Sequence, residues 1–298
     1  MSAISTPVRR PRRPREESGS PLLLGHGRLP RVLAGTALAV LAVAWLLPFV
    51  WAVATSLQSE QDVMKSGLSP FKGAFTLSAY RQILERGNVP TWAFNSLLIS
   101  VLVTLLTTVV SMLAAYGFSR GTFRGRRALL AVTVGAIMVP PQLLIVPLFD
   151  QMTMFHLVDT YAAVILPQVV APMMVFILKR FFDAIPRELE DAARIDGASE
   201  LRVFTSIVLP LSRPIVAAVA IFVFIGAWNN FMWPFVVTND PDLMTLPVGL
   251  ATVKDAYGIQ YAQSMASALL AALPLIVMFL LFQRRIVNSV ATTGLGGG

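Results

Sequence analysis

Runs of about 20 apolar residues, separated by shorter polar segments, are the feature of this 298-residue sequence that most restricts its fold. A helix needs about 20 residues to cross the roughly 30 Å hydrocarbon layer of a membrane at 1.5 Å per residue. Hydrophobic residues make up 55% of the chain and charged residues 13%, whereas soluble domains contain about 25% charged residues. The sequence therefore predicts an all-α, polytopic membrane protein.

Six segments have the required length, and none carries a Lys, Arg, Asp or Glu in its middle. The predicted spans are Val32–Leu57, Phe94–Phe118, Leu129–Phe149, Tyr161–Leu178, Ile215–Val237 and Met265–Phe282. Together they define a six-span domain at residues 32–298. Residues 1–31 are rich in Arg, Pro, Ser and Gly. They are expected to form a disordered, basic cytoplasmic tail because they have too few apolar side chains to offset the entropy of ordering.

The third predicted span contains two adjacent prolines, Pro140 and Pro141, within its apolar run. Proline lacks a backbone N–H and its ring clashes with the preceding turn, so a helix kinks or breaks there. A membrane tolerates the unpaired carbonyls of such a break only where neighbouring protein satisfies them. We therefore expect a kinked or broken third span that is buried in a helix bundle.

Lys and Arg residues are distributed unevenly between alternate connections. If the N-terminus is cytoplasmic, 19 of the 24 Lys and Arg residues fall in the tail and the cytoplasmic connections, and 5 in the outer ones. Basic residues are retained on the cytoplasmic side, so both termini are predicted to be cytoplasmic. The net charge of +8 follows this pattern of basic residues flanking apolar runs, which does not indicate nucleic-acid binding.

Two connections are long, an outer one at 58–93 and a cytoplasmic one at 179–214. The outer connection is expected to hold a short surface helix around Ser78–Leu84. The cytoplasmic connection is polar but strongly patterned, which a simple linker would not require.

A helix-turn-helix is predicted within the cytoplasmic connection, at about 186–214. Pro186 suits the first turn of a helix, and the acidic residues after it complement the helix dipole. Gly197 occupies the position at which helices commonly end in a left-handed residue, and Ser199 can cap the next helix.

Each arm of this helix-turn-helix has a face defined by spacings of three and four. On the first arm the face is narrow and mostly small, which permits close approach by another backbone, and it consists of Leu189, Ala192, Ala193 and Asp196. On the second arm the face is apolar and is expected to lie against the spans, and it consists of Leu201, Phe204, Val208 and Leu211. Periodicity alone is equally compatible with an amphipathic connector that rests on the membrane surface.

The residues of this loop form a long, ordered motif. It reads Pro-Arg-Glu-Leu-Glu-Asp-Ala-Ala-Arg-Ile-Asp-Gly-Ala-Ser from Pro186 to Ser199, followed by Phe204, Ile207–Pro210 and Pro214. This motif resembles the EAA loop of ABC importer permeases. From about Val32 to the C-terminus the chain resembles the sugar-importer class, specifically the smaller permease subunit of maltose-type transporters. The other matching segments are Asn95-Ser96, Phe123–Gly125, Pro140–Pro147, Asp159–Tyr161, Trp228–Pro234 and Thr245–Gly249.

The resemblance implies the fold and the partners of a type I ABC importer permease. Six spans would form half of a heterodimeric path in the cell inner (plasma) membrane, with a second homologous permease subunit as the other half. A cytoplasmic ABC ATPase dimer would power it, and an extracytoplasmic solute-binding protein would deliver a mono- or oligosaccharide. The alternative is a permease for a non-sugar solute such as a polyol-phosphate, an amino acid or a peptide.

The resemblance also implies which residues couple the permease to its ATPase. The EAA loop supplies a coupling helix that sits in a groove of the ATPase, and Asp191 stands where the family usually has a Glu that is one methylene longer. The residues implied in coupling are Glu190, Asp191, Ala192, Ala193, Asp196 and Gly197.

Aromatic and amide side chains lie close together near the outer end of the fifth predicted span, at Trp228, Asn229 and Asn230. Sugars are held by ring stacking and amide hydrogen bonds, so these residues are candidates for the substrate path. The competing interpretation, which we favour, is an interfacial aromatic belt with amides that pack between helices.

Motifs for catalysis, nucleotides or metals are not found in the sequence. There is no phosphate-binding Gly-rich loop, so ATP hydrolysis must come from a partner chain. The histidines, His26 and His156, have no partners at metal-ligand spacing, and there is no cysteine. An enzyme or a proton-coupled transporter would need polar or ionisable groups at mid-membrane, so neither class is favoured and no cofactor is expected.

Overall fold

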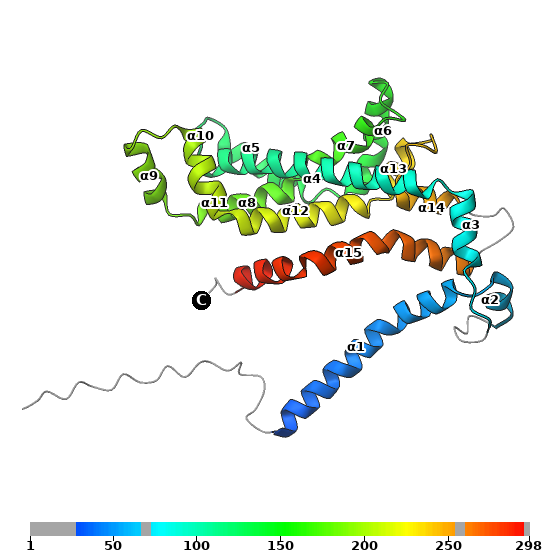
Figure 1. Cartoon of the computed structure of the whole chain (residues 1–298). Coiled ribbons are helices and arrows are strands. Elements are labelled where there is room, and N and C mark those ends of the chain that lie inside the picture. Colours follow the sequence, from blue (N-terminus) through cyan, green and yellow to red (C-terminus); the bar gives the residue numbers. More distant parts are fainter. Residues whose placement is uncertain (1–27, 67–72, 254–259, 295–298) are drawn as a thin grey trace, which may run out of the picture. The chain divides into compact units, whose positions relative to one another are not determined.

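The computed structural model describes residues 28–66, 73–253 and 260–294, and these ranges consist of helices and connecting loops without a strand. The chain divides into two compact units, residues 1–51 and 52–298, which are described separately (Figure 1). Of the predicted tail, residues 1–27 lie outside the described residues, and residues 28–31 already belong to the first helix.

The first unit contributes most of α1 (Arg28–Ser56), the last residues of which belong to the second unit. Its apolar stretch Val32–Ser56 is 25 residues long, which agrees with the first predicted span.

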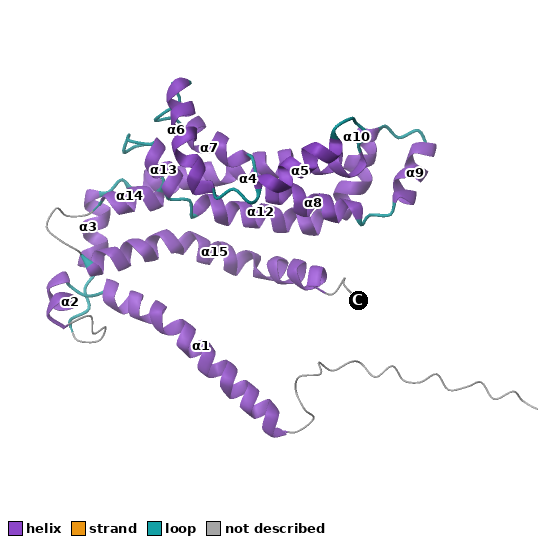
Figure 2. Ribbon diagram, turned by 180° about the vertical axis from the view of Figure 1, so that it is seen from behind, coloured by secondary structure: helices purple, strands orange, loops and turns teal. Residues whose placement is uncertain are grey.

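The second unit contains all remaining elements, and Figure 2 shows them from behind. They are α2 (Glu60–Ser66), α3 (Ser78–Arg86), α4 (Val89–Arg120), α5 (Arg126–Ala136), η1 (Pro141–Leu144), α6 (Ile145–Met154), α7 (Tyr161–Val169), α8 (Pro172–Asp183), α9 (Arg187–Ile195), α10 (Glu200–Val203), the π-helical turn η2 (Phe204–Val208), α11 (Leu209–Leu211), α12 (Arg213–Trp228), α13 (Met232–Val237), α14 (Leu246–Thr252) and α15 (Tyr261–Gly294). The predicted short helix near Ser78 is confirmed as α3, whereas α2 and α14 were not predicted.

Six membrane spans can be assigned by length and composition. Three helices are long and apolar enough by themselves: Val32–Ser56, Val89–Arg120 and Tyr261–Leu280. Three bent pairs satisfy the same requirement when each pair is taken together, with bends of 99°, 42° and 79°. These pairs are Arg126–Ala136 with Pro141–Met154, Tyr161–Val169 with Pro172–Asp183, and Glu200–Leu211 with Arg213–Trp228. The described residues thus provide up to six spans, as predicted, but the third pair includes Glu200–Leu211, which the sequence assigns to the cytoplasmic connection.

Prolines account for the breaks. The break predicted at Pro140 and Pro141 is confirmed as the 99° bend before α6. The fourth predicted span breaks because Pro172 begins α8 and holds Ala171 at φ −125° and ψ 84°, outside the helical region. The fifth breaks after Trp228 because Pro234 has no N–H to donate to the carbonyl four residues before it. A break was predicted only for the third span, and those in the fourth and fifth were not predicted.

α4 is the central helix of the second unit and packs against α7, α8, α12 and α14 (Figures 1 and 2). Small polar residues are buried along it, which lets neighbouring backbones approach closely. They are Ser96, Ser100, Thr107, Thr108 and Ser111. Three apolar clusters follow this helix from end to end, centred on Trp92, Val103 and Ala115. The core is therefore arranged along α4.

Side chains at the start of α4 hold the segment that leads into α14. Trp92 donates its indole N–H to the carbonyl of Pro241 at 2.8 Å, and Asn95 donates to the carbonyl of Asp242 at 2.7 Å. Ser96 accepts the backbone N–H of Leu246 at 2.8 Å. Gly249 of α14 lies so close to the Trp92 ring that a Cβ would come within 2.1 Å of it. The Asn95-Ser96 motif thus anchors a distant loop.

α5 differs from the expectation of a buried third span. None of its eleven described residues is buried, and Val132, Val139 and Leu143 around the following break are 69%, 41% and 70% exposed. Within this chain α5 contacts α8 but is not buried, so the predicted burial in a helix bundle stays a prediction.

Candidate functional site

The nine-residue helix α9 is closed by a turn at its C-terminus that confirms the predicted left-handed end. Gly197 has φ +81°. Its N–H donates to the carbonyl of Arg194 at 3.0 Å, and the N–H of Ala198 donates to the carbonyl of Ala193 at 2.9 Å. These two bonds are the pattern of a Schellman motif. The Ser199 hydroxyl then accepts the N–H of Arg202, as the cap of α10.

Most of α9 faces away from the rest of the chain. Leu189 is 47% exposed and Ile195, which ends the helix, is 86% exposed. Of the coupling residues implied by the sequence, Asp191, Ala192, Asp196 and Gly197 are exposed and Ala193 is partly buried. Glu190 is the exception, because among the nine residues of α9 it alone is buried.

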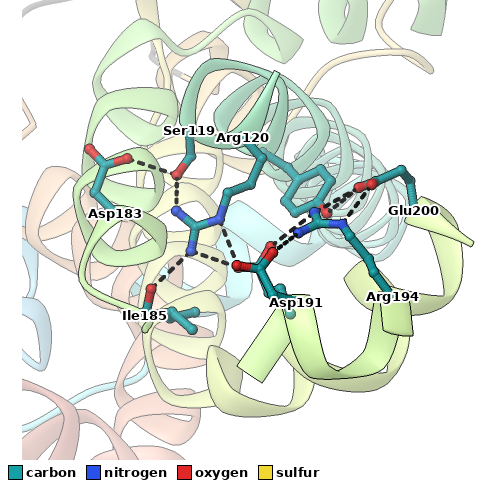
Figure 3. A network of polar contacts seen from close by, with 9 residues as sticks. Ser119, Arg120, Asp183, Ile185, Asp191, Arg194 and Glu200 are labelled. Carbon is teal, nitrogen blue, oxygen red and sulfur yellow. Dashed lines mark hydrogen bonds and ion pairs between the residues drawn. The ribbon is translucent and has the colours of Figure 1, made fainter. Parts of the chain in front are cut away.

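Glu190 binds Arg120, the last residue of α4, in a buried ion pair (Figure 3). The Nε and Nη2 atoms of Arg120 both lie 2.7 Å from Oε1 of Glu190, and the two side chains are 7% and 1% exposed. Nη2 also donates to the carbonyl of Ile185 at 3.0 Å, and Nη1 donates to the Ser119 hydroxyl at 2.9 Å. Ser119 in turn donates to Asp183 at the end of α8 at 2.7 Å.

Arg194 forms a second, more exposed group of contacts on α9 (Figure 3). Its guanidinium lies 2.8 Å from Asp191 and 2.9 Å from Glu200, the first residue of α10. The hydrogen bond to Glu200 raises the pKa of Arg194 further above its usual range. Tyr116 of α4 donates to the same Glu200 carboxylate at 3.2 Å. These contacts hold the two arms of the helix-turn-helix together.

The second arm turns its apolar face differently from the prediction. Val203, Phe204 and Val208 are buried, whereas Leu201 and Leu211 are 70% and 48% exposed. Leu211 follows a π-helical turn, in which the N–H of Leu209 donates to the carbonyl of Phe204 five residues earlier. One such turn shifts the register by one residue. The predicted packing of Phe204 and Val208 is confirmed, and that of Leu201 and Leu211 is wrong.

A pocket of about 430 Å³ lies where the third, fourth and fifth predicted spans are interrupted near Pro141, Ala171 and Asn230. Its wall includes Gln142 after the first break, Ala171 at the second and Asn230 at the third. Non-helical backbone at membrane depth is stable where it is buried in protein or lines a water-filled cavity. Asn230 donates to Gln168 at 2.8 Å, and this amide pair forms part of a mostly apolar wall.

The three candidate path residues do not form one group. Trp228 is 3% exposed and donates its indole N–H to the carbonyl of Ala271 in α15. Asn229 donates to the carbonyl of Ile225 in its own helix. Only Asn230 of the three lines the pocket. Among the described residues, no group of three or more His, Cys, Asp or Glu could hold a metal ion.

Sequence reasoning missed Arg120 and Gln168. Arg120 counted only as one of the basic residues after a span, and nothing local distinguishes it from Arg124 or Arg126. Gln168 is an amide within an apolar run, which is a detectable signal. Its partner Asn230 is 62 residues away in the chain.

Residues 107–291 match the family of binding-protein-dependent transport system inner membrane components. The chain is 35% identical over 262 residues to the arabinooligosaccharides transport system permease protein AraQ of Halalkalibacterium halodurans, covering 87% of this chain and 94% of that protein. It is 35% identical over 274 residues to the trehalose/maltose transport system permease protein MalG of Thermococcus litoralis, covering 90% and 98%.

The fold is also similar to that of a solved transporter. The match is to a chain of a bacterial ABC transporter involved in the import of the acidic polysaccharide alginate. It has a TM-score of 0.74 and 20% identity, and covers 87% of this chain and 98% of that chain.

Proposed function

Since the chain belongs to the binding-protein-dependent transport inner membrane components, we propose that it is one permease half of an ABC importer for a mono- or oligosaccharide. The observation that carries this proposal is similarity to oligosaccharide permeases over 87–90% of the chain, combined with an exposed α9 that has the EAA sequence. The fold is also compatible with a permease for a non-sugar solute, which is the second candidate, but no feature of the pocket favours it.

α9 is proposed as the coupling helix that docks into a cytoplasmic ATPase. Its outer face combines small side chains with exposed apolar ones, Leu189 and Ile195, which water alone would not favour. The small residues Ala192 and Gly197 allow close approach of a partner backbone. The excess of Lys and Arg in the connections at this end of the bundle favours a cytoplasmic location for α9 and for both termini in this proposal.

The pocket at the helix breaks is proposed as part of the solute path. Gln168 and Asn230 offer amide groups of the kind that hydrogen-bond sugar hydroxyls, and Trp233 adds an aromatic edge to the wall. Trp228 and Asn229 take structural roles in this proposal, in contact with α15 and with their own helix.

The exposed face of α5 is proposed to contact the second permease subunit. Around the break at Pro140 and Pro141, Met138 is 84% and Leu143 is 70% exposed, so this stretch presents apolar side chains that nothing in the chain covers. A second helical subunit would supply the apolar contact that this face lacks within the chain.

Reconstitution of the transporter tests the proposal. The chain is assembled in proteoliposomes with its partner permease, ATPase and solute-binding protein, and uptake of labelled solute is measured with and without ATP. We expect uptake that requires ATP and every partner chain. Uptake by this chain alone would refute the importer assignment.

A ligand screen on the cognate solute-binding protein tests the substrate class. Thermal shifts are measured with sugars, polyol phosphates, amino acids and peptides. Stabilisation by a mono- or oligosaccharide is expected, and selective stabilisation by an amino acid or a peptide would refute the sugar assignment.

A further inference from the structure

The helix α9 is attached to the bundle in an unusual way. Surface helices bury an apolar stripe, but of the nine residues that the structure describes in α9, the buried one is a carboxylate, Glu190. Its Oε1 atom receives two donors of Arg120, and its Oε2 atom lies 3.6 Å from Nη2 of Arg194. An ion pair therefore stands where a hydrophobic anchor would normally be.

Arg120 connects this anchor to three parts of the chain at once. Besides Glu190 it contacts Ile185 in the link between α8 and α9, and Ser119, which bonds to Asp183 at the end of α8. Arg120 is itself the last residue of α4, the helix along which the core is arranged. A displacement of α9 must therefore move the end of α4 or break several charge-assisted hydrogen bonds.

We propose that Arg120 is a positioning residue that locks α9 to α4, so that movement of the ATPase-docked helix is transmitted to the helices that line the solute pocket. Val103 and Thr107 of α4 line that pocket, and they lie on the helix that ends in Arg120. This inference rests on the proposed function for the direction in which force is transmitted, but the attachment itself does not depend on it.

The first experiment measures coupling in the complete reconstituted transporter. Arg120→Gln and Glu190→Gln remove one charge each, and Arg180→Gln is the matched control, since Arg180 is an exposed arginine at the same end of the bundle. ATP hydrolysis and solute uptake are measured on the same samples. We expect each single variant to assemble and hydrolyse ATP while uptake per ATP falls about tenfold or more.

The double variant Arg120→Gln/Glu190→Gln distinguishes a pair from two separate roles. It should lose no more coupling than either single variant, because one interaction is removed only once. The control should match the unmodified chain. An unchanged ratio of uptake to ATP in either single variant, or a parallel loss of both activities, would overturn the proposal.

The second experiment measures the attachment without using transport. The chain has no cysteine, so Glu188→Cys gives a single spin-label position on the exposed side of α9. Label mobility should rise with Arg120→Gln and remain low with Arg180→Gln. A label that stays immobile in Arg120→Gln refutes the lock even if uptake is lost. If the unmodified assembly shows no ATP-dependent uptake while the mobility result holds, the function fails and the lock stands.

Discussion

Gly197 shows how one residue can define the end of a functional helix. Its φ of +81° is accessible to glycine at no cost but costs other L-residues about 1–2 kcal/mol. No atom lies within 4 Å of an added Cβ. Within the chain itself, a substitution therefore acts through backbone strain and not through a clash.

We predict that Gly197→Val abolishes uptake without affecting membrane insertion, because a β-branched residue moves the turn out of the left-handed region. Gly197→Asn is the matched control, since Asn tolerates this region better. Membrane fractionation measures insertion, and solute uptake is measured in the assembled transporter. Normal uptake by Gly197→Val would contradict the assignment of α9 as the coupling helix.

Gly249 presents the opposite situation, in which space is the constraint. An added Cβ would lie 2.1 Å from a Trp92 ring atom, so Gly249→Ala should destabilise the chain by about 1–3 kcal/mol. Gly117→Ala, where no atom lies within 4 Å of the added Cβ, should be neutral or slightly stabilising. The measurement is the thermal unfolding midpoint in detergent. Equal midpoints for the two variants would show that α14 can move away from Trp92.

At the scale of the elements, three broken helices meet at one pocket. We predict that Asn230→Ala raises the KM for solute uptake with little change in ATP hydrolysis. The reason is that Asn230 and its hydrogen-bond partner Gln168 both line the pocket. Asn229→Ala is the control, since its side chain bonds to its own helix. Uptake constants are measured over a range of solute concentrations. The same KM in both variants would contradict the assignment of Asn230 to the solute path.

The sequence predicts those elements that depend on local chemistry. The span length, the break at Pro140 and Pro141, and the left-handed residue Gly197 all follow from residues close together in the chain. The breaks near Ala171 and Asn230 also have local causes in Pro172 and Pro234. These breaks are hard to predict, because an apolar run long enough to span a membrane is a stronger sequence signal for a continuous helix than one proline is against it.

The contacts between distant segments could not be predicted in this way. Arg120 and Glu190 are 70 residues apart, and periodicity placed Glu190 simply among the acidic residues of a helix start. The π-helical turn shifts Leu211 out of the expected packing, and a register change of one residue leaves no signature in the spacing. Which of these residues are buried therefore depends on contacts between distant segments, which residue spacing does not determine.

At the scale of the whole molecule, orientation follows from charge. We predict that Asp240→Cys reacts with a membrane-impermeant maleimide added to intact cells, whereas Arg124→Cys reacts only after permeabilisation. Both positions are exposed and the chain has no other cysteine. The measurement is labelling of the purified chain. The reverse pattern would place α9 outside the cell and exclude docking to a cytoplasmic ATPase.

The uncovered face of α5 has a consequence for the life of the chain in the cell. In the proposed assembly, the chain exposes this broken, apolar helix to lipid until the second permease subunit binds it. Synthesised without that companion, it should be recognised by membrane proteases and turned over quickly, and co-expression should extend its half-life in a pulse-chase measurement. The stoichiometry of the transporter would then be set by destruction of the unpaired subunit and not only by matched synthesis.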